Sequence, residues 1–466
     1  MNDFIILIIS VLHSSLAQAI AVLILCVFAL GASYFVFQTK YKGERRFPWL
    51  KTILALLLIG YATVLLSITV FRGAGGYRNV NLHLFRAWRE AWNSFSLKNW
   101  LNVLLNVAMF LPLGILLPLL IRCFRKWYFM LAAGFGVSLA IEGIQYLSCS
   151  GTFDVDDLFA NTLGAMLGFC IVMAVVSALT KDKSRRKRSI IYAILPIAAI
   201  AVLSGTFITY YAQEYGNLQD AAAFTVNTKG IIWELQCTLD DSVESVPVYR
   251  TEPFDKESCD AFGAAFFEMI GAVYDDVSYY DNATYFMNHA SPAHVLIVSH
   301  LDRSYEYSYG GQDDDWAETD EATLREMLLA YDIQIPESAE FTYEGDGWHQ
   351  FSVNRVIDGA AMINGTVRCR YTANGTLREI QNNMVSYAFY KNEDIISQTE
   401  AYELLCNGSI SGGGAFDYYS PEKITVLSCA PEYCIDTKGF YQPIYVFELF
   451  VSDADYTFQS IIPALQ

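Results

Sequence analysis

A group of acidic and amide side chains between positions 142 and 161 is the part of this chain best suited to chemistry. Its members are Glu142, Gln145, Asp154, Asp156, Asp157 and Asn161. Glu142 and Gln145 are three residues apart, so they share one face of a helix. Four carboxylates crowded at one depth need a cation, an arginine or raised pKa values to coexist. The group could therefore carry out carboxylate-dependent chemistry, alone or around a divalent cation.

Each member of this acidic group could also have a structural role. Asp154 or Asp156 could cap a following helix, because Asp is a preferred N-cap residue. Asn106, from an earlier apolar run, and Asn161 could hydrogen-bond neighbouring helices, and the GxxxG pair at 164–168 allows close helix approach. Considered one at a time, these residues are better explained by structural roles. Considered together, they are better explained by a functional site, because four carboxylates crowd at one depth.

Six apolar runs long enough to cross a membrane position these residues. They are 17–37, 49–71, 101–121, 127–147, 158–179 and 189–211. The loops 38–48, 122–126 and 180–188 between them are basic, and basic loops are retained on the cytoplasmic side. The pattern predicts a multi-pass cell-membrane protein with an outside N-terminus, and it places everything after the last span outside as well.

The distribution of charge divides the chain. Residues 1–211 carry a net charge of +11 and residues 212–466 carry −29, which together give −18. We predict an N-terminal span with its basic loop, a membrane domain, a last span with its basic loop, and an acidic extracytoplasmic α+β domain. Their boundaries are 1–48, 49–180, 181–211 and 212–466. We expect no nucleic acid as a partner for the acidic domain, which suits a cation or a protein partner better.

The loop 72–100 is basic although it is predicted to lie outside. Apolar and aromatic residues recur in it at helical spacing, which favours a helix lying in the headgroup layer. Arg86 and Arg89 fall largely on the other side of that helix. They could serve as a simple anchor, bind an anionic headgroup or pyrophosphate, or pair with the acidic group.

Four segments, in this order, resemble the VanZ-like family. They are VNLHLF at 80–85, NVLLNVAMFLPLGILLP at 102–118, IEGIQ at 141–145 and GTFDVDDLFANTLGAMLGF at 151–169. The resemblance covers roughly 50–180 and implies an integral membrane protein of bacteria, in a family whose founding member is linked to low-level teicoplanin resistance. It assigns no reaction. The motif positions it marks are Asn106, Glu142, Gln145, Asp154, Asp157 and Asn161.

The acidic domain alternates between helical and strand-like patterns. Helices are predicted at 255–273, 319–331 and 396–406, the last with Ser397 and Glu400 as a capping box. Strands are predicted at 230–237, 293–300, 349–356, 361–371, 384–390, 423–430 and 441–451, and the turn at 374–375 fits a hairpin that joins 361–371 to 375–381. The layout around 340–455 loosely resembles PepSY-type repeats and the outer domains of YycH/YycI-type regulators of Gram-positive histidine kinases, which implies a binding or regulatory module.

Six cysteines lie in the acidic domain, and their pairing is open. Cys429 and Cys434 are close enough in sequence for a local disulfide, which an oxidising exterior would favour. The alternative is that the cysteines are mostly free and buried.

The sequence thus predicts a VanZ-like protein with an extracytoplasmic regulatory or binding domain, which acts at the outer leaflet on or with a membrane lipid or lipid-linked envelope precursor. The resemblance implies teicoplanin resistance as one phenotype. One alternative is a membrane sensor or accessory protein of a signalling system. The other is a carboxylate- or metal-dependent membrane enzyme acting on a lipid-linked substrate. No cofactor is predicted beyond a divalent cation, and no metal-ligand motif such as HExxH occurs.

Overall fold

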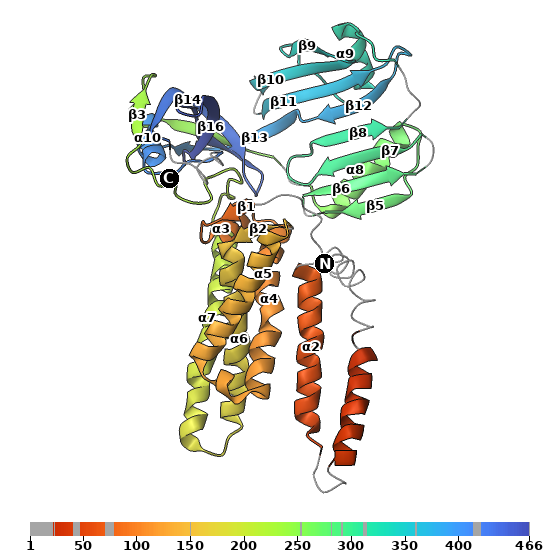
Figure 1. Ribbon diagram of the computed structural model, residues 1–466. Coiled ribbons are helices and arrows are strands. Elements are labelled where there is room, and N and C mark those ends of the chain that lie inside the picture. The colour runs from red at the N-terminus through yellow and green to blue at the C-terminus, as the bar shows by residue number, and fades with distance from the viewer. Residues whose placement is uncertain are drawn as a thin grey trace. The chain divides into compact units, whose positions relative to one another are not determined.

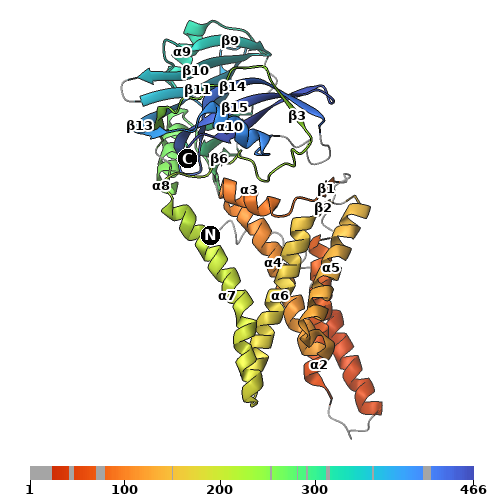
Figure 2. The same cartoon turned by 90° about the vertical axis from the view of Figure 1, so that its left-hand side faces the viewer.

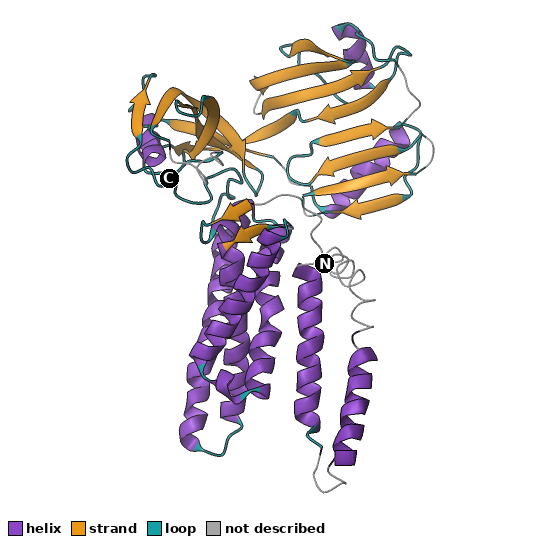
Figure 3. Ribbon diagram, viewed as in Figure 1, coloured by secondary structure: helices purple, strands orange, loops and turns teal. Residues whose placement is uncertain are grey.

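The structure is a computed structural model that describes residues 22, 24–40, 47–69, 79–149, 151–251, 254–280, 282–289, 292–310, 315–358, 361–412 and 421–465. The chain forms two compact units (Figure 1). The first contains Met1–Ala91 and Lys98–Gln213, and the second contains Trp92–Leu97 and Glu214–Gln466. Helices dominate the first unit and strands the second (Figure 3).

Five helices of the first unit are long and apolar enough to cross a membrane. They are α2 (Trp49–Thr69), α4 (Leu97–Leu120), α5 (Trp127–Leu147), α6 (Val155–Ala178) and α7 (Lys183–Ala212), the last over Arg186–Ala212. They correspond to the last five predicted spans. A shorter apolar helix, Ile24–Lys40, overlaps the predicted span 17–37, which begins outside the described residues. The predicted first span, 17–37, and the outside N-terminus therefore stay predictions.

Short elements connect these helices. The strands β1 (Asn79–Asn81) and β2 (Thr152–Asp154) form a parallel pair, and the 3₁₀ helix η1 (Arg122–Arg125) joins α4 to α5. The helix α3 (Arg86–Ser94) confirms the helical pattern predicted in the loop 72–100. Its first turn follows Phe85, whose φ of 68° ends the extended segment before it.

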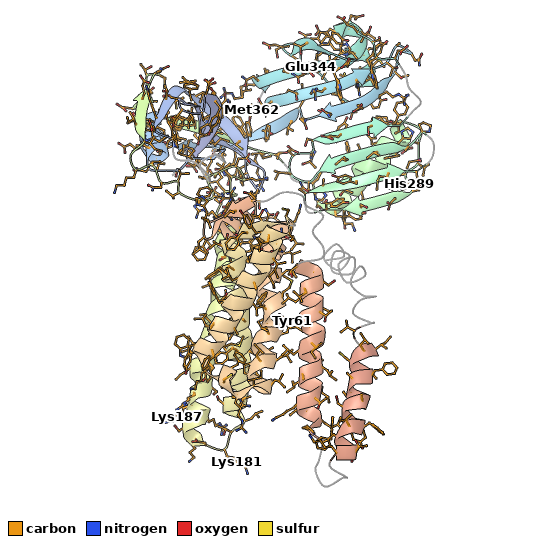
Figure 4. All side chains as sticks on the ribbon, in the orientation of Figure 1. Tyr61, Lys181, Lys187, His289, Glu344 and Met362 are labelled. Atoms are coloured by element: carbon orange, nitrogen blue, oxygen red, sulfur yellow. The ribbon has the colours of Figure 1, made fainter. Side chains whose placement is uncertain are left out.

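The helices α4, α5 and α6 lie side by side in both views (Figures 1 and 2). The predicted close approach at the GxxxG pair is confirmed, because Gly164 and Gly168 lie against the backbone of Val107 and Leu111 on α4. Large apolar side chains from α2, α4, α5 and α6 fill the interior around this contact. The Tyr61 hydroxyl of α2 donates to the Met109 carbonyl oxygen at 2.8 Å (Figure 4), so α2 is also fastened to α4.

The second unit is built on one large sheet whose strands are antiparallel apart from the β3–β14 pair. The strands are β3 (Ile232–Leu235), β4 (Ser245–Arg250), β5 (Asp276–Tyr279), β6 (Ala283–Asn288), β7 (His294–Ser299), β8 (Tyr305–Tyr309), β9 (Glu340–Gly345), β10 (Trp348–Asp358), β11 (Ala361–Tyr371), β12 (Leu377–Asn382), β13 (Val385–Asp394), β14 (Lys423–Ile435), β15 (Phe440–Val451) and β16 (Tyr456–Pro463). Their order is β3-β14-β15-β4-β13-β11-β12-β8-β7-β6-β5, with β10 between β11 and β9, and β16 beside β15.

Three helices cover parts of this sheet. They are α8 (Lys256–Met269), α9 (Glu321–Leu329) and α10 (Gln398–Cys406), which confirm the three helices predicted in this region. The first two pack on one apolar core with β6 to β8 and β10 to β12, and α10 packs on another with β14 to β16. The capping box of Ser397 and Glu400 is present, and the predicted turn at 374–375 joins the paired strands β11 and β12.

Candidate functional site

Asp154 builds the entrance to α6. Its carboxylate accepts the backbone N–H of Asp156 at 2.8 Å, which confirms the capping role open to it from the sequence. The same carboxylate accepts two contacts from the Asn81 amide nitrogen, each at 3.1 Å, across the β1–β2 pair. The carboxylate of Asp154 is therefore occupied by donors from its own helix and from β1.

Asp156 secures the start of α3. Its side chain is 1% exposed, and its carboxylate accepts the backbone N–H groups of Phe85 and of Ala87, the latter at 2.6 Å. The first N–H groups of a helix have no partner within the helix, so an acidic side chain from elsewhere can cap them. Asp156 thus fixes the loop before α3 to α6, which is a structural role.

Glu142 and Asp157 form the centre of the group. Glu142 on α5 is 2% exposed, and its Oε2 accepts the Asp154 N–H at 3.1 Å. Asp157 is one residue beyond Asp156 on α6, and it accepts a hydrogen bond from the Asn106 amide of α4. The structure therefore brings Asn106, Glu142, Asp154 and Asp157 together, as the sequence predicted.

A polar contact lies one helical turn deeper between α5 and α6. The Asn161 amide nitrogen donates to the hydroxyl of Ser138 at 3.0 Å, and both side chains are buried. The carbonyl oxygen of the Asn161 side chain is fully buried and has no hydrogen-bond partner in the described part of the chain. A buried acceptor left without a donor costs about 1–3 kcal/mol, so this oxygen points to a missing donor.

The remaining candidates lie around this centre. Gln145 donates to the carbonyl oxygen of Thr69 at 2.8 Å and so fastens α5 to the end of α2. Arg86 forms an ion pair with Glu90 at 2.9 Å, and Arg89 is exposed. Within the described ranges neither arginine pairs with Asp154, Asp156 or Asp157. The pairing alternative is therefore not supported, and headgroup binding by these arginines stays a prediction.

The negative charges of the four carboxylates are not balanced by cationic side chains in the part of the chain that the structure describes. No lysine or arginine among the residues that the structure describes forms an ion pair with Glu142, Asp154, Asp156 or Asp157. Nor does that part of the chain hold three or more His, Cys, Asp or Glu side chains arranged for a metal ion. The donors seen at the site are backbone N–H groups and amides.

The predicted local disulfide does not fit the structure. Cys429 and Cys434 both lie on β14, and both are free thiols. Five residues of extended strand separate their Cα atoms by about 16 Å, whereas a disulfide needs a separation below about 7 Å. Proximity in sequence was misleading because the segment between them is a straight strand and not a turn.

Two residues of the site, Ser138 and Asn81, were not predicted from the sequence. Ser138 precedes Glu142 by four residues and so shares its helix face, a spacing that could have identified it. Asn81 lies in the segment VNLHLF, but its contact with Asp154 depends on the β1–β2 pairing. A strand pair of three residues leaves little pattern in the sequence.

Comparison with known proteins identifies the membrane part. Residues 52–177 match the VanZ/LLP1 family model. This segment is VanZ-like. It contains most of α2, all of α3 to α5, almost all of α6, and the whole acidic group. The chain therefore combines a VanZ-like segment with five apolar helices that are long enough to cross a membrane.

The comparison with solved structures is less informative. One similar solved structure is the Bacillus megaterium YpeB C-terminal domain, at 10% identity and a TM-score of 0.17, covering 46% of this chain and 95% of that domain. A TM-score this low carries no argument about this chain. No curated protein matches the chain.

Proposed function

We propose that this VanZ-like protein binds the polar part of a membrane lipid or lipid-linked envelope precursor at the outer ends of α4, α5 and α6. The observation that carries the proposal is the unpartnered acceptor of Asn161 beside the unbalanced carboxylates of Glu142 and Asp157. Polar groups among apolar membrane helices are costly and are kept where they serve a function.

The chemistry of the group indicates what it would bind. The carboxylates of Asp154 and Asp156 are taken up by described donors, whereas Glu142 and Asp157 each receive one described hydrogen bond. Their remaining acceptor capacity and the free oxygen of Asn161 suit a ligand rich in hydrogen-bond donors. Hydroxyl, amide and ammonium groups of an envelope headgroup have this character.

The phenotype we propose is resistance to teicoplanin, which follows from the family resemblance. The test compares susceptibility to teicoplanin and to vancomycin in cells that express the wild type, Glu142→Gln or Glu90→Gln. The last is the matched control, because it makes the same chemical change at an exposed side chain of α3. We expect Glu142→Gln to abolish resistance at unchanged membrane expression and Glu90→Gln to retain it. Full resistance with Glu142→Gln would refute the proposed site.

A truncation after Tyr211 separates the alternatives. Resistance that survives truncation but is lost with Glu142→Gln would place the activity in the membrane helices and make the second unit an accessory. Resistance lost on truncation but kept with Glu142→Gln would favour the sensor alternative. An enzyme acting on a lipid-linked substrate would lose turnover with Glu142→Gln and with Asp157→Asn, which an assay of lipid extracts would detect.

A further inference from the structure

The parallel pair β3–β14 brings two cysteines of the second unit to the same level. The ladder ends with Leu235 opposite Val426, and the next hydrogen bond runs from the Gln236 N–H to the Val426 carbonyl oxygen at 2.9 Å. Cys237 lies two residues beyond Leu235 on the β3 side. Cys429 lies three residues beyond Val426 on the β14 side.

A β-bulge in β14 removes this difference of one residue. The register of β14 against β15 shifts between Val426 and Ser428, so two residues of β14 advance the ladder by one step. When this register is extended past Leu235, where β3 ends, Cys429 is two steps beyond Val426 and comes level with Cys237 in the bend that follows. Neighbouring strands lie about 4.8 Å apart, which falls within the range of about 4.4–6.8 Å that a disulfide requires between Cα atoms.

The two thiols also share one environment. Both side chains are half-buried and pack on the core that α10 covers. Burial raises the pKa of the Cys429 thiol to about 12, and the charge of a nearby Cys237 thiolate adds to the rise. The interaction agrees with the short separation that the strand register indicates.

We propose that Cys237 and Cys429 form a disulfide in the cell, which covalently fastens the edge strand β3 to β14. The proposal rests on the extracytoplasmic location of the second unit, because the cytosol keeps thiols reduced. It goes beyond the proposed headgroup binding, since the bond constrains only the second unit. The disulfide would close the long stretch of chain between Cys237 and Cys429 into a loop, and it would stabilise the fold mainly by restricting the unfolded chain.

The reaction requires a disulfide-bearing thiol oxidase outside the cytoplasm. The Cys237 thiolate attacks one sulfur of the oxidase disulfide, that bond breaks, and a mixed disulfide forms. Cys429 then loses its proton to solvent and attacks the sulfur of Cys237, and the oxidase leaves as a dithiol. In total two electrons and two protons pass from the pair of thiols to the oxidase and solvent.

The experiment uses the full chain expressed in cells and treated with N-ethylmaleimide before lysis. Non-reducing tryptic digestion and mass spectrometry then search for peptide 230–250 linked to peptide 424–438. We expect the linked pair in the wild type and its loss in Cys237→Ser and Cys429→Ser. Cys434→Ser is the matched control, because it removes the other thiol of the same peptide and should retain the link. Reduction should lower the melting temperature by about 5 °C or more in the wild type and leave that of Cys237→Ser unchanged.

A second arm treats reduced, purified protein with diamide. Suppose that both thiols carry maleimide in cells, whereas the reduced, purified protein forms the link under diamide. This result would overturn the proposal that the disulfide forms in the cell, and it would count against the outer location of the second unit. The lack of a link under diamide as well would overturn the register argument and leave the proposed function unaffected.

Discussion

Substitution of Gly164 by alanine tests the helix contact that positions the acidic group. A β-carbon at Gly164 would overlap the carbonyl oxygen of Val107 and lie 2.9 Å from its carbonyl carbon and 3.1 Å from its Cα. Carbon atoms in normal contact are about 3.5–4.0 Å apart. Because the obstacle is backbone and not a flexible side chain, α4 and α6 would have to separate by about 1 Å or more to relieve the overlap with the Val107 oxygen.

The cost of that separation follows from overpacking. Extra methyl groups in a well-packed interior typically cost about 1–3 kcal/mol. For a unit of this size, each kcal/mol corresponds to about 2–4 °C, so we expect the melting temperature to fall by about 2–12 °C. Asn106 precedes Val107 on α4, so the same displacement would weaken its hydrogen bond to Asp157 and with it the activity.

The assay is thermal melting of the purified full chain in detergent, with Gly136→Ala as the matched control. Gly136 lies in the apolar helix α5, and a β-carbon there meets no atom within 4 Å. We expect Gly136→Ala to melt like the wild type or slightly above it, because alanine favours helix. An unchanged melting temperature for Gly164→Ala, or an equal loss for both variants, would refute the close contact.

Three further predictions concern single side chains. Asp156→Asn should free the start of α3, because an amide cannot accept both N–H groups as the carboxylate does. Faster hydrogen exchange over 85–94 would show this release. Asp182→Asn, which changes a carboxylate at the start of α7, is the control and should leave exchange over 85–94 unchanged. Ser397→Ala should destabilise the second unit by about 0.5–2 kcal/mol through loss of the capping box, measured by chemical unfolding beside Ser452→Ala, an exposed serine outside the helices. Burial lowers the pKa of His349, whose Nε2 accepts the Thr319 N–H, so the unfolded chain is protonated first as pH falls. The contribution of neutral His349 is therefore complete above the unfolded pKa of about 6.5 and declines below it, and the stability gap between wild type and His349→Gln should narrow from pH 7.5 to 5. A gap that is constant over this range would contradict the assignment.

Much of the membrane part could be predicted because its signals are local. Length and apolarity define the spans, and the spacing of Gly164 and Gly168 marks a helix contact that the structure confirms. The capping role of Asp154 follows from residue type alone. Asp156 could not be assigned in this way, since its partners are backbone N–H groups about 70 residues earlier, and any residue type can supply them.

The second unit shows the same division between local and distant signals. Its three helices were predictable from periodicity and from the Ser397 capping box. Short strands such as β5 and β6 were not, because four to six residues give no clear alternation and their pairing is decided by distant neighbours. The cysteines are the clearest case, since Cys429 lies near Cys434 in sequence, whereas the strand register extended past β3 brings it level with Cys237.

The acidic group itself separates into two kinds of residue. Asp154 and Asp156 are held by donors from β1, α3 and α6, so they build the site and their loss should disturb architecture before activity. Glu142 and Asp157 keep acceptor capacity next to the unpartnered oxygen of Asn161, so amide substitutions there should remove activity from a folded protein. Comparing hydrogen exchange at α3 with resistance in the same variants would separate these roles. If Glu142→Gln loosened α3 as much as Asp156→Asn, all four carboxylates would be structural and the ligand site would have to lie elsewhere.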